Sequence, residues 1–184
     1  MYDSSIQTIG MRFAGIDIPQ GAAVGAAWIQ FEADEVQSEA TFLTIQGQDA
    51  DHAATFTTTA FNVSSRPRTS ATVGWEPVAW TTVAAAGPDQ RTPDLTSIIQ
   101  EIVDRPGWAA GNAIAVVVTG SGHRTARAYD SKPAAAPLLH IELAAGPVNR
   151  APVVNAGPDQ TITWPDTVDV LIGAKTAVQY PRTT

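Results

Sequence analysis

Alternation of apolar and polar residues along extended stretches is the feature that most limits how this chain can fold. In residues 8–18, Ile9, Met11 and Phe13 fall on one side of an extended backbone, and residues 40–47 alternate in the same manner. Side chains two positions apart share one face of a β-strand, whereas a helix brings together side chains three or four positions apart. The pattern therefore predicts β-strands, each with one buried face.

Further strands are expected along the chain, separated by turn residues such as Pro19-Gln20-Gly21. They cover residues 24–31, 70–75, 79–83, 113–119, 124–129 and 138–143. The run at 113–119 is apolar almost without interruption, which is typical of a central strand buried on both faces. Residues 48–65 contain few apolar side chains and are expected to form a long loop.

One helix is expected, and it starts at Thr92. A threonine hydroxyl can cap free amides, Pro93 suits the first helical position, and Asp94 complements the helix dipole. An apolar stripe with helical spacing follows, made of Leu95, Ile98, Ile99, Ile102 and Val103. Pro106-Gly107 ends the pattern, and we expect the helix to lie across the strands as a lid or end plug.

Successive strands with a single helix predict an all-β fold, namely an antiparallel β-sandwich of the jelly-roll type with one short α-helix. The 184 residues, of which 44% are hydrophobic and 16% charged, suffice for one packed domain. The composition changes at Ala144-Ala145-Gly146-Pro147. We therefore expect one domain over residues 1–145, and a linker with an incomplete second segment, extended or disordered, over residues 146–184.

The chain is acidic, with a net charge of -7. Phosphate backbones are bound by clustered Lys and Arg, so the charge excludes a nucleic-acid partner. An acidic surface repels anionic membranes, and no apolar run reaches the roughly 18 residues that membrane insertion requires. The absence of cysteine excludes disulfides, thiolate metal sites and a cysteine nucleophile. This surface suits neutral glycans, bound cations and solubility outside the cell, and the alternative is that it serves solubility alone.

Several blocks within residues 8–143 resemble bacterial and archaeal surface modules of the disaggregatase-related DNRLRE type. The blocks are Ile9-Gly10-Met11-Arg12-Phe13, Ile18-Pro19-Gln20-Gly21-Ala22, Ala27-Trp28-Ile29-Gln30-Phe31, Leu43-Thr44-Ile45-Gln46-Gly47, Val73-Gly74-Trp75, Thr92-Pro93-Asp94-Leu95 and Pro106-Gly107-Trp108. The resemblance implies a jelly-roll fold and a role similar to that of carbohydrate-binding modules, which accompany polysaccharide lyases and cell-surface proteins. It also implies bound calcium, an extracellular or cell-surface location, and a polysaccharide or cell-surface glycan as partner.

Residues 151–165 resemble the opening strand of a PKD-type immunoglobulin-like domain. From about residue 168 the sequence departs from that pattern, and about 35 residues cannot build a sandwich of seven strands. A truncated first strand is therefore expected in this part of the chain.

Acidic residues in two strand connections are the best candidates for metal ligands. Calcium takes roughly six to eight oxygen ligands, and neighbouring loops at one end of a sandwich can supply them. The candidate ligands are Asp34, Glu35, Glu39, Asp49 and Asp51. The alternative is that these residues are solvated loop acids that form local turns.

Aromatic rings and arginines are the candidates for binding a glycan. A ring can cover the apolar face of a sugar, and the forked hydrogen bonds of arginine can orient hydroxyls or a uronate carboxylate. The expected ligand-binding residues are Trp80, Tyr129, Arg66 and Arg124. The alternative for these four is core packing or surface charge, and the other tryptophans, Trp28 among them, are expected in the core.

The sequence contains no recognisable catalytic motif. Gly120-Ser121-Gly122-His123 lacks the spacing of a nucleophile elbow, and the three histidines lack the spacing of a metal site. We therefore expect a noncatalytic carbohydrate-binding or adhesion module. The alternatives are a structural spacer or surface-layer domain that self-associates through its sheet edges, and a small extracellular hydrolase or metalloenzyme.

Overall fold

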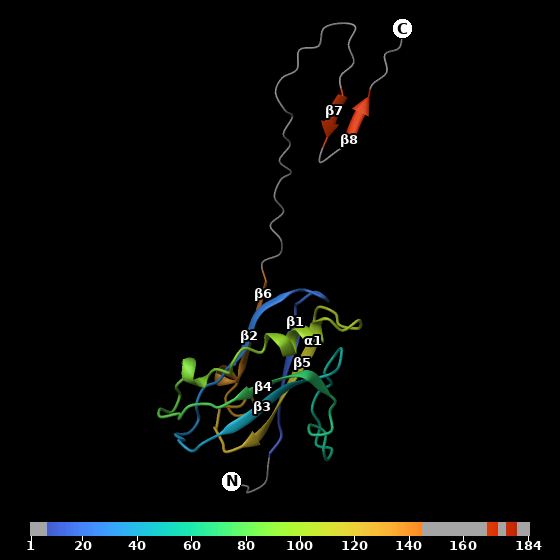
Figure 1. The fold of residues 1–184 in the computed structure, drawn as a ribbon. Coiled ribbons are helices and arrows are strands. Elements are labelled where there is room, and N and C mark those ends of the chain that lie inside the picture. The colour runs from blue at the N-terminus through green and yellow to red at the C-terminus, as the bar shows by residue number, and fades with distance from the viewer. Residues whose placement is uncertain (1–6, 145–168, 173–175, 180–184) are drawn as a thin grey trace, which may run out of the picture. The chain divides into compact units, whose positions relative to one another are not determined.

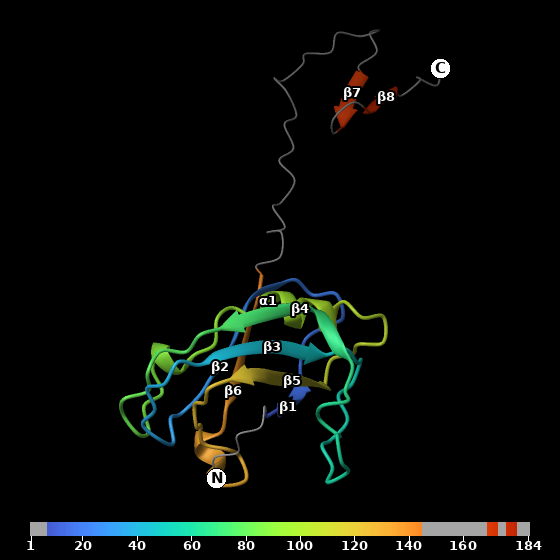
Figure 2. The ribbon, with the colours of Figure 1, turned by 60° about the horizontal axis from the view of Figure 1, so that its bottom comes forward.

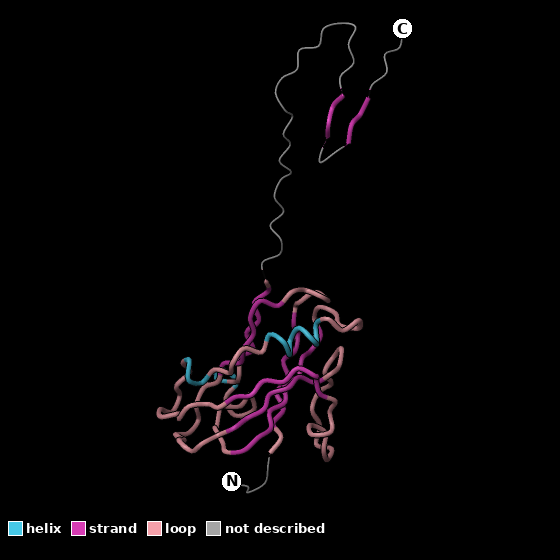
Figure 3. Tube along the Cα trace, viewed as in Figure 1, coloured by secondary structure: helices cyan, strands magenta, loops and turns pink. Residues whose placement is uncertain are grey.

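The computed structural model describes residues 7–144, 169–172 and 176–179. The chain divides into two compact units, Met1–Gly146 and Pro147–Thr184. The first is mostly β, with antiparallel strands and one α-helix, as the alternation predicts (Figure 3). Among the described residues, no helix has the length and apolar character needed to cross a membrane. The PKD-like strand expected at residues 151–165 lies outside the described residues.

Four strands form the larger sheet, sheet A, in the order β1-β5-β3-β4 (Figure 2). They are β1 (Ile9–Ile16), β3 (Phe42–Gln48), β4 (Arg68–Trp75) and β5 (Asn112–Ser121), and all neighbours are antiparallel. In β5, every residue from Ala113 to Val118 is buried. This confirms the central strand that the apolar run at 113–119 predicts. Loop 49–67 covers its outer side, where Ala53 packs on Ala115.

Two strands form sheet B, β2 (Val24–Gln30) and β6 (Leu138–Leu143), which lie side by side in Figure 1. The segment at residues 90–95 runs along the other edge of β2. The Thr92 amide donates to the Ile29 carbonyl, and the Ile29 amide donates to the Thr92 hydroxyl, both at 3.0 Å. Within the described residues, β6 is therefore the edge of sheet B without a further partner.

The helix α1 comprises Thr96–Val103, so the expectation that Thr92 caps its start is wrong. The hydroxyl of Thr92 is engaged with β2 instead. Asp94 supplies the side-chain acceptor near the helix start. Its carboxylate accepts hydrogen bonds from the Thr96 amide at 3.1 Å and the Thr96 hydroxyl at 2.6 Å. The predicted apolar stripe is buried, and the helix packs against β2, β3 and β4.

Two expected strands, residues 79–83 and 124–129, are reduced to single antiparallel bridges. Trp80 bridges to Gln37, and Ala84 then takes a left-handed backbone conformation (φ 64°) that turns the chain. Ala126 bridges to Ala33. Two short 3-10 helices, Pro88–Gln90 and Pro133–Ala135, lie in the connecting segments.

The second unit contains one described element, an antiparallel pair of short strands. These are β7 (Asp169–Ile172) and β8 (Thr176–Gln179), and Val170 pairs with Val178.

Candidate functional site

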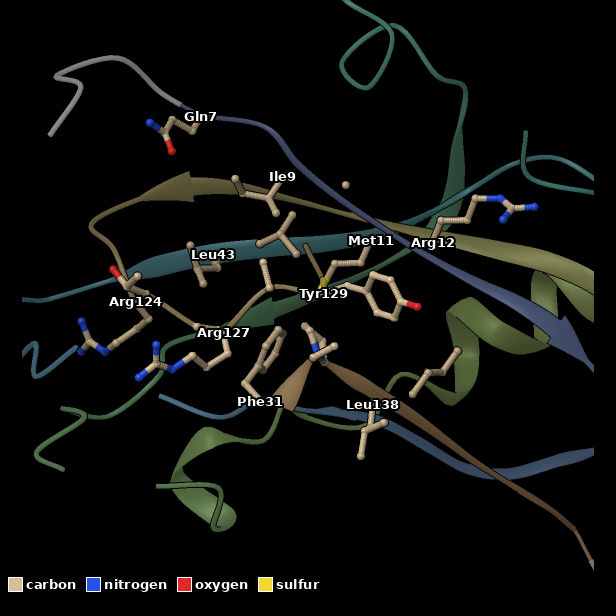
Figure 4. A pocket seen from close by; sticks show the side chains of 18 of the residues that line it. Gln7, Ile9, Met11, Arg12, Phe31, Leu43, Arg124, Arg127, Tyr129 and Leu138 are labelled. Atoms are coloured by element: carbon tan, nitrogen blue, oxygen red, sulfur yellow. The ribbon is translucent and has the colours of Figure 1, made fainter. Parts of the chain in front are cut away.

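A groove of about 1560 Å³ is lined by residues of β1, β6 and the chain between β5 and β6 (Figure 4). Its apolar lining includes Ile9, Met11 and Phe13 of β1, Leu43 of β3 and Leu139 of β6. Met11, Phe13 and Leu139 are only partly buried, although they pack against the main core. The groove is thus a part of the sandwich interior that is accessible from outside.

The fold leaves this opening because α1 closes only one side of the sandwich. The helix inserts Ile98 and Ile102 beside Gly47 of β3 and packs against β2 and β4. The groove lies beside β1 and β6 instead. Among the described residues, β1 pairs only with β5 and β6 only with β2, so each strand has an edge without a strand partner.

Polar residues of the chain between β5 and β6 form one end of the groove. Arg127 is held by an ion pair with Asp34 at 2.6 Å. Tyr129 is 69% exposed, and its side chain projects at the groove in Figure 4. The ring is therefore accessible from outside, and ligand binding by Tyr129 stays a prediction.

Trp80 is placed differently from the ligand-facing position expected for it. Its side chain lines the floor of the groove but is 1% exposed, and its indole N–H donates to the Asp89 carbonyl at 3.0 Å. Its ring lies 6.4 Å from that of Phe31, centroid to centroid. Trp80 is therefore a core residue at the groove floor, with its one polar group already satisfied.

Arg66 and Arg124 also hold the fold together in the structure. Arg66 is buried against the Phe56 ring, and its guanidinium donates to carbonyls of loop 49–67, including Ala54 at 2.7 Å. Burial lowers the pKa of Arg66 from its ordinary value. The Arg124 side chain is 3% exposed and donates to Thr41 and to four backbone carbonyls. Neither guanidinium offers the free donors that binding a sugar requires.

The five acidic metal candidates lie in two separate places, before and after β3. Asp34 pairs with Arg127, and Glu35 accepts hydrogen bonds from Gln37 and Thr125. Glu39 pairs with His123. These three acids are on the side of β3 that precedes Phe42.

Asp49 and Asp51 follow the other end of β3, where both pair with Arg105. The hydrogen bond from Arg105 to Asp51 is the main reason why the pKa of Arg105 is raised. A strand of seven residues spans roughly 20 Å, so the two groups cannot share one ion. Among the described residues, no three acidic or histidine side chains come together as metal ligands. The five carboxylates do not fit a single calcium site.

A row of side chains crosses the outer face of sheet B, with the half-buried Trp28 between the exposed Arg91 and His140, and we call these three residues the aromatic row. The Trp28 and His140 rings are stacked, with centroids 5.2 Å apart and an interplanar angle of 11°. The Arg91 guanidinium lies 4.9 Å from the centre of the Trp28 ring. Arg91 and His140 belong to segments on opposite sides of β2, so the row runs across the sheet.

The expectation that Trp28 lies in the core missed this row. The signal was present in the alternation itself, because Ala27 and Ile29 are fully buried and side chains of a strand alternate between faces. Trp28 must then point outward. The same argument places His140 outward, since its neighbours Leu139 and Ile141 pack against the core.

No protein-family model, curated protein or solved structure matches this chain. The function is therefore inferred from the geometry of the row and the groove.

Proposed function

We propose that this chain is a noncatalytic carbohydrate-binding or adhesion module that acts outside the cell and binds a polysaccharide or cell-surface glycan at the aromatic row. The observation that carries the proposal is the position of Trp28 and His140, which stack on the outer face of a sheet instead of filling the core. His140 and Arg91 are exposed.

The chemistry of the row suits a sugar ring. The C–H-rich face of a sugar packs on an aromatic surface, and the exposed His140 ring, which is stacked on Trp28, offers such a surface. Arg91 offers exposed forked donors for hydroxyls or a uronate carboxylate. Arg91 and His140 lie on opposite sides of β2, so the row offers the two kinds of contact to a glycan chain that crosses the strand.

Gln30 helps to keep Arg91 in position over the Trp28 ring. Gln30 of β2 accepts a hydrogen bond from Arg91 at 3.3 Å and donates to the Gly87 carbonyl at 2.9 Å. Both bonds fix Arg91 over the Trp28 ring. A pre-positioned guanidinium loses less side-chain entropy when it binds a ligand.

Binding of neutral and uronate polysaccharides to the intact protein tests the proposal, with Arg91→Gln and His140→Ala as variants. Both residues are exposed, so the fold should survive their replacement. Each variant is expected to weaken glycan binding at least tenfold. The matched control is Phe42→Ala, because Phe42 is 53% exposed at the start of β3 and outside the row.

The outcome that contradicts the proposal is equal glycan binding by the wild type and both row variants, or no glycan binding at all. If no glycan binds and sedimentation shows assembly that grows with concentration, the chain is a self-associating structural domain. The strand edges of β1 and β6 that lack partners among residues 7–144 favour that second candidate.

A further inference from the structure

We propose that Asn62 is an attachment site for an N-linked oligosaccharide, and that the first sugar of this oligosaccharide packs on the exposed ring of Phe61. The site lies in loop 49–67, which projects from sheet A in Figure 2, whereas the aromatic row lies on sheet B. The inference rests on the proposed function only for the location outside the cell. It does not depend on glycan binding at the row.

The first argument is a motif in loop 49–67. Asn62-Val63-Ser64 has the spacing N-x-S/T, without proline at the middle position, that oligosaccharide transfer to asparagine requires. The chain has four asparagines, and none of the other three is followed by serine or threonine two positions later. Residues 57–61 and 64–65 are exposed on both sides of Asn62. The motif therefore stands on an accessible loop, where an acceptor asparagine is expected.

The second argument is the orientation of the Asn62 side chain. Its Oδ1 atom accepts hydrogen bonds from the Thr57 amide at 3.0 Å and from Nη2 of Arg66 at 3.2 Å. Both partners can only donate, so the oxygen faces them and the Nδ2 group turns away. Among the described residues, Nδ2 has no hydrogen-bond acceptor, and it is not buried. Nδ2 is the atom to which an N-linked sugar is attached.

The transfer step leaves the hydrogen bonds of Asn62 intact. The bond between C1 of the first sugar and the diphosphate of a polyprenyl-linked oligosaccharide breaks, and a bond between C1 and Nδ2 forms. Nδ2 loses one of its two protons to the leaving polyprenyl diphosphate, and a transferase of the host cell catalyses the exchange. Oδ1 is unchanged and still accepts from Thr57 and Arg66. The folded loop can therefore carry the oligosaccharide.

The third argument is the position of Phe61, the neighbour of Asn62. Its side chain is 77% exposed, and its backbone has a left-handed conformation (φ 61°) that is unfavourable for a residue other than glycine. The Phe61 carbonyl accepts from the Ser65 amide at 2.9 Å and the Ser65 hydroxyl at 2.8 Å. These bonds hold the turn that presents the ring to solvent.

A sugar attached to Asn62 would give this ring a partner. The C–H-rich face of a sugar packs on an aromatic ring, and covalent attachment to the next residue keeps the sugar close to it. Residues 53–65 contain no charged side chain that could cover the ring in its place. The loop thus combines an acceptor amide with an adjacent apolar surface for the first sugar.

Secretion of the full chain from a yeast host tests the attachment. Intact-mass measurement is expected to show one added oligosaccharide, and its enzymatic release should convert Asn62 to aspartate. Ser64→Ala destroys the motif but keeps the Ser64 carbonyl that accepts from Arg68, so it should abolish the addition without disturbing the loop. Thr58→Ala is the matched control, because it removes an exposed hydroxyl of the same loop outside the motif.

Thermal unfolding of four secreted proteins tests the contact between sugar and ring. They are the wild type, Ser64→Ala, Phe61→Ala and the double variant, which form a double-mutant cycle. The oligosaccharide is expected to raise Tm by about 3 °C when Phe61 is present, and by much less when residue 61 is alanine.

Two outcomes would overturn the inference. An unmodified Asn62 in the secreted wild type would remove the attachment site. An equal rise in Tm with and without Phe61 would remove the packing on the ring. Arg91→Gln is expected to weaken glycan binding at the row and leave the modification of Asn62 unchanged. A modified chain that binds no polysaccharide would therefore contradict the proposed function alone.

Discussion

Gly47 of β3 lies directly against Ile102 of α1. A Cβ atom added to this glycine would lie 2.7 Å from Cδ1 of Ile102 and 2.9 Å from Cγ2 of Ile98. The distance between β3 and the helix is therefore set by the absence of a side chain at residue 47. This contact fixes how deeply α1 enters the sandwich.

Gly47→Ala is expected to destabilise the protein by about 1–3 kcal/mol, because the added methyl group forces α1 or its side chains to move. Gly74→Ala in the neighbouring strand is the control, since a Cβ there meets no atom within 4 Å. Urea unfolding of the two variants measures the difference. Equal midpoints would show that the helix adjusts freely.

Arg124→Ala is expected to lower the free energy of unfolding by about 3 kcal/mol, because several carbonyl acceptors lose their partner at once. These acceptors include the Val78, Pro77 and Glu39 carbonyls. Lys132→Ala, which removes an exposed pair with Glu32, should change stability by less than about 1 kcal/mol. Chemical denaturation checks both values, and similar losses would contradict the structural role of Arg124.

Asp94 gives the stability a pH dependence that can be measured. The Thr96 hydroxyl, followed by the amides of Ala27 and Thr96, lowers the pKa of Asp94 despite partial desolvation. A lowered folded-state pKa stabilises the protein above the unfolded-state value of about 3.9, and this stabilisation is lost as pH falls through the folded-state pKa.

Asp94→Asn is therefore expected to cost about 1 kcal/mol at pH 7, because the amide keeps the acceptor oxygen but loses the charge that strengthens these hydrogen bonds. The difference from the wild type should shrink as the pH falls below that of ordinary aspartate titration. Urea unfolding at a series of pH values measures this, with Asp89→Asn as an exposed control. A difference that stays constant down to pH 2 would refute the assignment.

Asp49 and Asp51 are expected to act as partners of Arg105 and not as calcium ligands. Arg105→Gln leaves two neighbouring carboxylates without their cation, so it should lower stability by about 1 kcal/mol, and by more at low salt. Thermal unfolding in calcium and in EDTA tests the alternative. A calcium-dependent rise in Tm that Asp49→Asn and Asp51→Asn abolish would make these residues ligands.

The strands were predictable because side chains in a strand point alternately to the two faces, so burial alternates with the same period of two residues. Residues 138–143 alternate in the sequence, and β6 has the same bounds in the structure. The start of α1 was not predictable in this way. Thr92 can cap a helix or pair with a strand, and its contact with Ile29, which is remote in sequence, decides between the two.

The candidate site was predictable only in part, for a similar reason. The outward direction of Trp28 follows from its neighbours Ala27 and Ile29. The burial of Trp80 and Arg124 depends on Asp89, Thr41 and other remote partners that alternation does not reveal. The groove depends on which strands lie at sheet edges, and that order is a property of the assembled topology.

The accessible apolar lining beside Met11 and Leu139 changes how this protein must be assayed. Dyes such as anilinonaphthalene sulfonate fluoresce on exposed apolar surface and commonly serve as reporters of molten states. Here the native fold itself offers them a binding surface. Bright dye fluorescence from a freshly purified sample is then expected from the intact sandwich. Loss of that fluorescence on heating would mark unfolding of the sandwich.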